Sequence, residues 1–366
     1  MKSGDKQGVI LITGSAGRIG TRMAERLGDR YHIVGFELLK AIYASKNEEL
    51  VPLDIASDES VKQAFMHIKN FYGTKITSVI HLAAYYSFSD TSYDKYKEVT
   101  VDGTRRLLDA LQEFEVEQFI FSSTMLVHKP QNPPHLIKET SPREGSWAYP
   151  RSKIETEEMM HKHAKNIPTA VLRIAGVYDD RCHSIPISNQ IQRIYEKQVT
   201  ARFFPGNLTH GAAFLHMDDL VDAIELSVEK RKELPKETVF LIGEGDTMSV
   251  DEMQKMISKE IYDFEMVTVR IPQFLAYIGA WMLCHIPFIP KPFIRPWMIP
   301  FSDDNYILDI SKAKKLLGWQ PKKSIRKELP KLIKLLLKDP AQFYKDNGLI
   351  PPKNKSKLWK KQKKKH

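Results

Sequence analysis

Short apolar runs alternate with amphipathic segments through the first half of the chain. Residues 9–12 are four consecutive apolar residues, three of them β-branched, which predicts a fully buried strand. Residues 18–27 then follow a helical pattern. Further strands are predicted at 31–36, 51–55, 76–81, 118–121, 169–174 and 239–243, and further helices at 58–69, 96–113 and 148–165. This alternation predicts parallel βαβ units with right-handed crossovers.

The predicted fold class is therefore α/β, a doubly wound parallel sheet of the Rossmann type with a smaller mixed α/β substrate lobe. A chain of 366 residues is long enough for two such lobes. We expect residues 1–176 to form the nucleotide-binding domain, to which elements near 212–243 return. Residues 177–330 would form the substrate lobe. Residues 331–366 would form a basic helix and tail, with the last part disordered.

A glycine-rich turn connects the first predicted strand to the first predicted helix. Gly14, Gly17 and Gly20 follow the strand directly, in the spacing G-x-x-G-x-x-G. Gly14 permits the tight turn, Gly17 lets the backbone approach a pyrophosphate, and Gly20 allows close helix–strand packing. The order of strand, turn and helix predicts dinucleotide binding, with an ordinary structural turn as the alternative.

An acidic residue follows the second predicted strand. Glu37 lies 23 residues after Gly14, where a carboxylate can accept both ribose hydroxyls of the adenosine half and repel a 2′-phosphate. The predicted cofactor is therefore NAD. Arg18 and Lys40 are alternatives that could meet a phosphate instead.

The candidate chemistry lies in Tyr149 and Lys153, which share one face of a predicted helix. An ammonium beside a phenol is expected to lower the pKa of the phenol, which could then act as a general acid or base. Thr124, at the end of the preceding strand, could hold the substrate oxygen. Tyr93 and Lys97 repeat the spacing, but they precede that strand and are expected on a surface helix.

These residues resemble the extended short-chain dehydrogenase/reductases, the NAD-dependent epimerase/dehydratase superfamily. The similarity continues through residues 172–178, 214–219 and 312–321. It implies bound NAD, hydride exchange at a secondary alcohol or ketone carbon, Tyr149 as catalytic acid/base, and a homodimer. The catalytic residues implied are Thr124, Tyr149 and Lys153. The cofactor-binding residues implied are Gly14, Ala16, Gly17, Arg18, Ile19, Gly20, Glu37, Asp54, Ile55, Leu82, Ala83, Ala84, Tyr149, Lys153 and Ile174.

Four positions depart from the pattern of that family and put the substrate in doubt. Thr100 replaces a usual Asn, Ile174 a usual Pro, Asp179-Asp180 a usual Gly-Pro, and His128 a frequent Tyr.

A second informative region contains no Asp, Glu, Lys or Arg between Ile271 and Pro290. Pro287 and Pro290 end any helix there, which leaves about 21 Å, short of a ~30 Å hydrocarbon core. We therefore expect no transmembrane segment. A core helix of the substrate lobe and an apolar wall or interfacial patch for a lipid-soluble substrate are the two interpretations. This part resembles the 3β-hydroxysteroid dehydrogenase branch.

The net charge of +10 belongs to the C-terminal end. Residues 1–305 hold 36 basic against 41 acidic residues, and residues 353–366 add eight lysines without an acid. Such a tail could contact an anionic membrane surface, although basic tails are most often solvated, and no specific nucleic-acid partner is expected. Two cysteines and a polar N-terminus favour a cytoplasmic location. No metal site is predicted, because His161 and His163 point to different faces of a helix.

Three functions follow as hypotheses. The first is an NAD-dependent oxidoreductase acting on a hydrophobic, sterol- or isoprenoid-like secondary alcohol. The second is a nucleotide-sugar epimerase or dehydratase, which would need cationic clamps; residues 211–214 offer none, although Arg193 and Arg202 are available. The third is a non-catalytic NAD-binding regulator, which the presence of Tyr149 and Lys153 disfavours.

Overall fold

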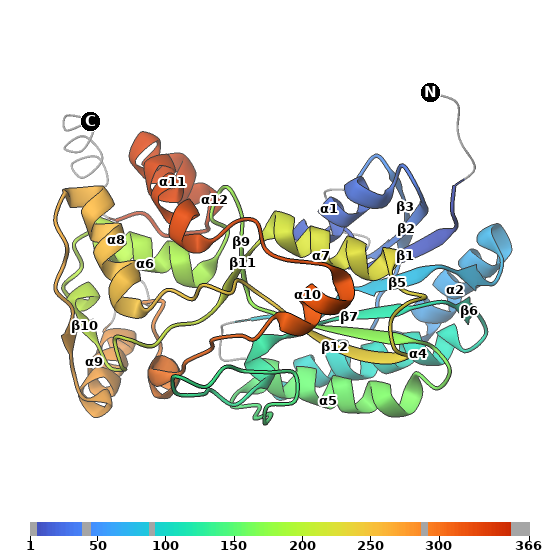
Figure 1. Ribbon diagram of the computed structural model, residues 1–366, viewed down its shortest axis with the longest axis horizontal. Helices are drawn as coiled ribbons and strands as arrows, with labels where there is room; N and C mark the ends of the chain where they lie inside the picture. Colours follow the sequence, from blue (N-terminus) through green and yellow to red (C-terminus); the bar gives the residue numbers. More distant parts are fainter. Residues whose placement is uncertain (1–5, 39–44, 88–91, 287–291, 353–366) are drawn as a thin grey trace.

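The computed structural model describes residues 6–38, 45–87, 92–286 and 292–352. Two lobes lie side by side along the longest axis (Figure 1). One lobe is built around a seven-stranded sheet, and the other is mainly helical. Lys40, Pro287, Pro290 and the lysine-rich segment 353–366 lie outside the described residues.

The large lobe contains a fully parallel sheet in the order β12-β8-β7-β5-β1-β2-β3. Its strands are β1 (Val9–Thr13), β2 (His32–Glu37), β3 (Glu48–Pro52), β5 (Ser78–His81), β7 (Phe119–Thr124), β8 (Thr169–Ile174) and β12 (Glu237–Ile242). The chain leaves β1 toward one edge through β2 and β3 and continues toward the other edge from β5. Such a reversal creates a crevice at the carboxyl ends of β1 and β5, where ligands bind in sheets of this kind. The predicted doubly wound α/β fold is confirmed.

Two layers of helices cover the sheet. One face packs against α1 (Arg18–Leu27), α7 (Met217–Glu229) and α10 (Ser311–Leu317), and the other against α2 (Asp58–Tyr72), α4 (Gly103–Leu111) and α5 (Ala148–His163). Strand β1 serves both layers, because side chains alternate along a strand. Ile10 and Ile12 enter the first core, and Val9 and Leu11 the second.

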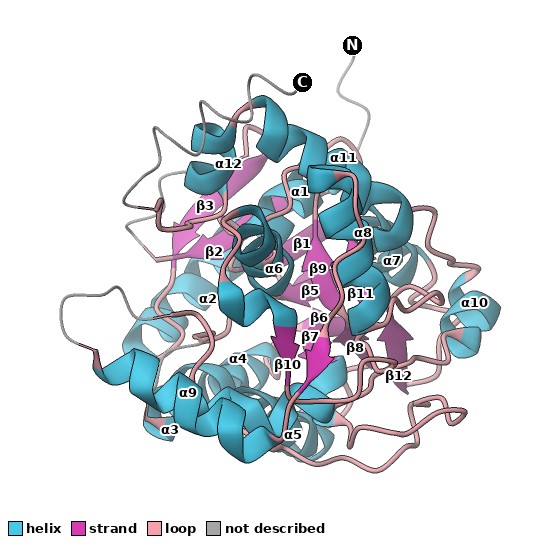
Figure 2. Ribbon diagram, turned by 90° about the vertical axis from the view of Figure 1, so that its left-hand side faces the viewer, coloured by secondary structure: helices cyan, strands magenta, loops and turns pink. Residues whose placement is uncertain are grey.

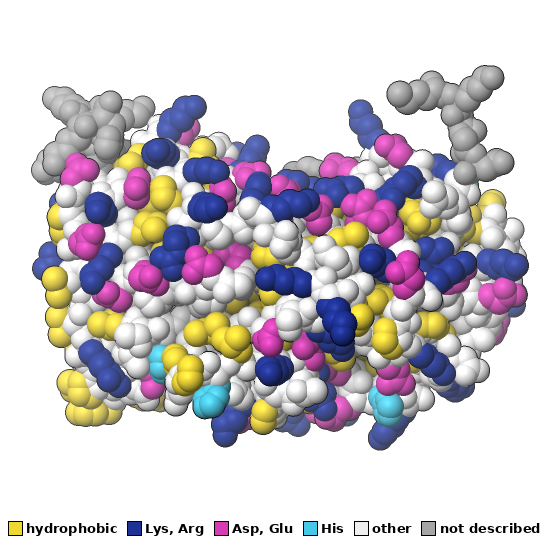
Figure 3. All heavy atoms as spheres, viewed as in Figure 1, with side chains coloured by type: hydrophobic (Ala, Val, Ile, Leu, Met, Phe, Trp, Pro, Cys, Tyr) yellow, Lys and Arg dark blue, Asp and Glu magenta, His cyan; other side chains and the backbone are white. Residues whose placement is uncertain are grey.

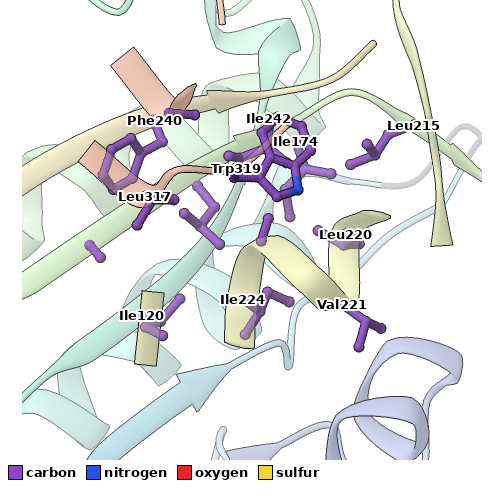
Figure 4. Packing of buried hydrophobic residues seen from close by; sticks show 14 of the residues in the cluster. Ile120, Ile174, Leu215, Leu220, Val221, Ile224, Phe240, Ile242, Leu317 and Trp319 are labelled. Atoms are coloured by element: carbon purple, nitrogen blue, oxygen red, sulfur yellow. The ribbon is translucent and has the colours of Figure 1, made fainter. Parts of the chain in front are cut away.

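Trp319 joins the C-terminal part of the chain to the first core (Figure 4). Its ring is 2 % exposed among Ile174, Leu220 and Ile242, and its Nε1–H donates to the carbonyl of Asp219 at 2.9 Å. Helix α10 ends just before it at Gly318, whose φ of +66° favours glycine. The pattern of residues 305–319 predicts a helix that stops at a glycine; the glycine stop is present, but the helix begins at Ser311.

The small lobe has a core of its own, formed by α6 (Ile185–Tyr195), α8 (Val250–Tyr262), α11 (Ile325–Lys338) and α12 (Pro340–Asp346). Parallel pairs join β9 (Gly176–Tyr178) to β11 (Phe214–His216) and β10 (Phe203–Phe204) to β13 (Val269–Arg270). Helix α9 (Gln273–His285) follows β13 and runs along the lower edge of this lobe in Figure 2, opposite α12. The 3-10 helix Pro296–Asp303 comes next. A further short pair in the large lobe joins β4 (Lys75–Ile76) to β6 (Glu115–Val116).

Two predicted elements differ in detail. The helix expected over 96–113 is α3 (Tyr93–Tyr96), a π-helical turn Lys97–Asp102 and then α4. Periodicity cannot reveal such a turn, because one inserted residue shifts the apolar face only locally. The strand expected at 51–55 is β3, which ends at Pro52. No helix within the described ranges is long and apolar enough to cross a membrane.

Candidate active site

The glycine turn is shaped to leave backbone N–H groups open. Gly14 has a φ of +69°, and a β-carbon on Gly20 would lie 2.4 Å from the Gly14 carbonyl oxygen. Gly17 is the N-cap of α1, and no side chain caps the helix there. The first N–H groups of α1 therefore face the crevice without a side-chain acceptor, as a pyrophosphate requires.

Glu37 lies beside the glycine turn and is hydrogen-bonded to it. Its carboxylate accepts the N–H of Ala16 at 3.2 Å and that of Leu38 at 2.9 Å. Asp54 and Ile55 lie close by, because the N–H of Leu53 donates to the carbonyl of Glu37 at 2.9 Å. Asp54 is exposed, whereas Ile55 is buried. This carboxylate beside an uncapped helix start fits the adenosine ribose and pyrophosphate of NAD.

A buried hydrogen-bond chain fixes the end of β5 against β1. The Thr13 hydroxyl accepts the N–H groups of Leu82 and Ala83 at 3.2 and 3.1 Å and lies 2.6 Å from His81 Nδ1. His81 Nε2 lies 2.8 Å from the Thr104 hydroxyl, which donates to the carbonyl of Thr100. Burial lowers the pKa of His81 to about 3, so this imidazole is neutral. Leu82, Ala83 and Ala84 are thereby held beside the glycine turn.

The three predicted catalytic residues converge at the carboxyl end of β7. Thr124 is the last residue of β7, and Tyr149 lies in the first turn of α5. The Lys153 ammonium lies 5.8 Å from the centre of the Tyr149 ring and donates to the carbonyl of Ser122 at 2.7 Å. The aromatic ring of Phe121 lies under the same ammonium, at 4.7 Å.

The expected lowering of the phenol pKa by Lys153 is wrong for the protein alone. Burial raises the pKa of Tyr149 to about 12, and the Thr124 hydroxyl opposes only part of this rise. Burial also lowers the pKa of Lys153 to about 7, while Glu157 opposes that fall. Charge on either group is costly because Lys153 is buried and Tyr149 is half-buried. Sequence spacing shows that the two residues share a helix face, but it does not show how deeply they are buried.

A buried ion pair between Glu157 and Arg173 lies next to Lys153 and the end of β7. Glu157, one turn after Lys153, accepts from the Ser123 hydroxyl at 2.6 Å and from Arg173 at 2.6 and 3.1 Å. Arg173 also donates to His128 Nε2 at 3.0 Å. The side chains of Arg173 and Glu157 are 5 % and 6 % exposed, so this ion pair is buried and geometrically well satisfied.

Aromatic rings form the side of the site that faces the small lobe. Tyr86 and Trp147 lie 4.8 and 5.6 Å from the Tyr149 ring, and Trp297 lies 5.6 Å from Trp147. The short loops around these residues show neither a helical nor a strand periodicity, so the sequence does not predict that these aromatic residues belong to the site. Their contacts depend on the packing of segments that lie far apart in the chain.

The model of the family described as NAD dependent epimerase/dehydratase matches residues 10–243. The chain belongs to this family. It is an NAD-dependent enzyme of the extended short-chain dehydrogenase/reductase group, as the motifs implied.

Individual relatives are distant. The chain is 24% identical to a UDP-glucuronate 4-epimerase of Thermodesulfobacterium geofontis over 89% of this chain and 95% of that protein. It is also 24% identical to Short-chain dehydrogenase/reductase family 42E member 1 of Homo sapiens, over 85% and 83% of the two chains. A solved UDP-glucuronic acid 4-epimerase from Bacillus cereus, in complex with UDP-glucuronic acid and NAD, has a TM-score of 0.66 at 22% identity and covers 90% of this chain and 99% of that one. This last likeness shows the shared fold.

The side chains of three further residues expected to contact NAD have contacts within this epimerase/dehydratase-family protein, and their contact with NAD stays a prediction. Arg18 donates to the carbonyl of His183 at 2.9 Å, so its guanidinium joins the two lobes across the crevice. Ile19 packs partly buried against the first core. Ile174 pairs with Thr124 across the sheet and lies in the same core. The second Tyr–Lys copy spans α3 and the π-helical turn: the Tyr93 hydroxyl donates to Glu155 at 2.5 Å, and Lys97 is exposed.

The positions that depart from the family pattern have structural partners. Thr100 accepts the N–H of Tyr85 at 3.1 Å, and His128 holds Arg173. Asp179 accepts the N–H of Arg181 at 2.9 Å, whereas Asp180 is bound by Lys323 at 3.1 Å.

Asp180, His216 and Asp218 form a possible metal-ligand group in the described part of the chain. The Lys323 ammonium lies 2.9–3.3 Å from an atom of each. A cation of the protein itself thus already pairs with both carboxylates and offsets one of their two negative charges.

Proposed function

We propose that the protein is an epimerase-type enzyme that moves a hydride and a proton at a secondary alcohol carbon of a nucleotide sugar. The observation that carries the proposal is the convergence of Thr124, Tyr149 and Lys153 beside the crevice between β1 and β5. The similarity to UDP-sugar 4-epimerases over most of the chain supports this substrate class.

The residues divide the work as follows. The Thr124 hydroxyl holds the substrate oxygen, and Tyr149 removes or returns its proton. Lys153, which donates to the Ser122 carbonyl, would bind the nicotinamide ribose and, when charged, would favour the phenolate. The glycine turn and Glu37 would hold NAD, which when bound would supply a reversible hydride acceptor for the carbinol carbon. Burial disfavours the Tyr149 phenolate in the free protein, and a positive charge brought to the site by bound NAD would favour it.

A second candidate function is an NAD-dependent dehydrogenase or reductase for an apolar, sterol- or isoprenoid-like secondary alcohol. It is favoured by the run of rings from Tyr149 through Trp147 to Trp297. It is also favoured by the stretch 211–214, Gly-Ala-Ala-Phe, which brings no cation for a second pyrophosphate. The homodimer, the boundary after residue 176 and the cytoplasmic location stay predictions.

The experiment is a substrate panel with purified protein and NAD. UDP-glucuronic acid, UDP-glucose, a 3β-hydroxysterol and an isoprenol are each incubated, with epimers read by NMR and net reduction of NAD read at 340 nm. We expect a nucleotide sugar to be epimerised without net reduction. Stoichiometric reduction of NAD by the sterol or isoprenol, without turnover of any nucleotide sugar, would replace the first candidate with the second.

Tyr149→Phe tests the assigned proton carrier, and Tyr93→Phe is its matched control. We expect Tyr149→Phe to lower turnover by ~10²–10⁴-fold, the range for loss of a general acid or base, while NAD binding persists. Tyr93→Phe removes a phenol at the same Tyr–Lys spacing on α3 and should keep wild-type turnover. Equal losses in the two variants would dismiss the assignment.

A further inference from the structure

Helix α9 has an inverted arrangement of side chains. Its small residues Ala276, Ala280 and Cys284, four apart, face the protein, and among the helix residues Ala280 alone is fully buried. Its large apolar residues face outward. Phe274 is 64 % exposed, and Ile278 and Trp281 are each 50 % exposed. The interpretation of this segment as a core helix is therefore wrong.

The exposed surface continues beyond the helix. Val199, Phe203, Val267 and Val269 on the preceding segments are all 40 % or more exposed. We call these residues together with the outward face of α9 the apolar edge. Figure 3 shows apolar side chains gathered at the lower left of the molecule, where α9 lies in Figure 1. Large apolar patches of this kind mark sites of interaction with other surfaces.

The charged residues around the apolar edge indicate which kind of partner can cover it. Residues 266–302, which lie between Glu265 and Asp303, contain no Asp or Glu, and their charged residues are Arg270, Lys291 and Arg295. Arg270 and the nearby Arg202 are exposed, and neither forms an ion pair with a described residue. In a two-fold contact with a second copy the outward face of α9 would meet itself, and that helix has no acid to pair with Arg270 or Arg202. Anionic lipid headgroups supply the missing charge.

Length narrows the choice further. Helix α9 has 13 residues, about 20 Å at 1.5 Å per residue, which cannot span a ~30 Å hydrocarbon core. Exposed Trp281 and Tyr277 are the side-chain types enriched at the boundary between lipid headgroups and acyl chains. A short helix with large apolar side chains outward and a basic rim is suited to lie in one leaflet.

We propose that the apolar edge docks on an anionic lipid surface, with the outward face of α9 in the headgroup–acyl boundary. The docked edge is close to the site, because Trp297, in the 3-10 helix next to α9, contacts Trp147 beside Tyr149. The proposal does not rest on the substrate class, since vesicle binding is measured without turnover.

The test is flotation of the full chain with vesicles of phosphatidylcholine containing ~30% phosphatidylglycerol, and with pure phosphatidylcholine. We expect the wild type to float with the anionic vesicles. A triple variant, Phe274→Ser, Ile278→Ser and Trp281→Ser, should lose more than about tenfold in partitioning. The matched control, Met66→Ser with Phe71→Ser, changes exposed apolar residues on α2 and should float like the wild type.

Three results would overturn the proposal. The triple variant could float as well as the wild type, or deletion of 353–366 alone could abolish flotation. Light scattering could instead show a dimer that the triple variant dissociates without any flotation of the wild type, which would assign the edge to a second copy. Circular dichroism of the triple variant checks that the fold is intact.

Discussion

Strand β1 and helix α9 are both runs of apolar residues, and the protein treats them in opposite ways. All five residues of β1 are buried between two helical layers, whereas α9 turns its largest side chains to the outside. Strand β1 carries the glycine turn, so its burial places the cofactor crevice. Helix α9 carries no candidate catalytic residue. The contrast shows that an apolar run can be used either for the core or for a surface, according to what packs on it.

The largest expected effect is on the buried side of this comparison. Leu11→Ala removes a fully buried side chain from β1 and should lower the free energy of unfolding by about 2–5 kcal/mol, through lost burial and the cavity left behind. Chemical denaturation of the two proteins measures this difference. A loss below about 0.5 kcal/mol, the size of an ordinary surface substitution, would contradict the packing described for β1.

A smaller change in the free energy of unfolding is expected at Lys153, an ionisable side chain buried in the same lobe. Lys153→Met removes a buried ammonium and should raise stability at pH 7 by ~1–4 kcal/mol while abolishing turnover. The sign follows from the two states of the lysine: unfolded, it keeps its proton up to about pH 10.4, and folded, it has a pKa of about 7.

Between these values the unfolded chain binds more protons, so the wild type gains stability as pH rises. The advantage of Lys153→Met should therefore shrink from pH 7 toward pH 10. Thermal unfolding across this range checks it, and an advantage that does not change with pH would count against the buried, shifted lysine.

The smallest effect is expected on the exposed side. Ile278→Ser on α9 should change the free energy of unfolding in lipid-free buffer by less than about 0.5 kcal/mol, because the side chain is already half exposed. The measurement is the same denaturation as for Leu11→Ala. A loss close to that of Leu11→Ala would show that α9 packs against the protein through this residue, and the comparison between β1 and α9 would fail.

The sequence predicts those elements whose structure depends on residues close together in the chain. The segment from Val9 to Leu27 is confirmed at nearly every boundary, because an apolar run, glycines and a helical period all act within a few residues. The meeting of Thr124 with Tyr149 also follows from order in the chain, because α5, which connects β7 to the parallel strand β8, begins at the carboxyl end of β7.

Long-range packing explains what the sequence leaves out. The bond from Lys153 to the Ser122 carbonyl, and the ring contact of Trp147 with Trp297, join segments whose local patterns carry no sign of each other. The exposure of α9 belongs to the same class. An apolar segment without a period predicts that its side chains avoid water, but it does not predict which surface covers them.

The central claim of the proposed function is that Tyr149 is a half-buried phenol with a raised pKa that would release its proton when NAD binds. Tyrosinate absorbance at 295 nm, titrated with and without NAD in the wild type and in Tyr149→Phe, tests this directly and needs no substrate. We predict that NAD makes one tyrosine of the wild type ionise ~1–3 pH units below its value of about 12 in the free protein, and that Tyr149→Phe lacks this change. An identical response of both proteins to NAD, or no response in the wild type, would contradict the account.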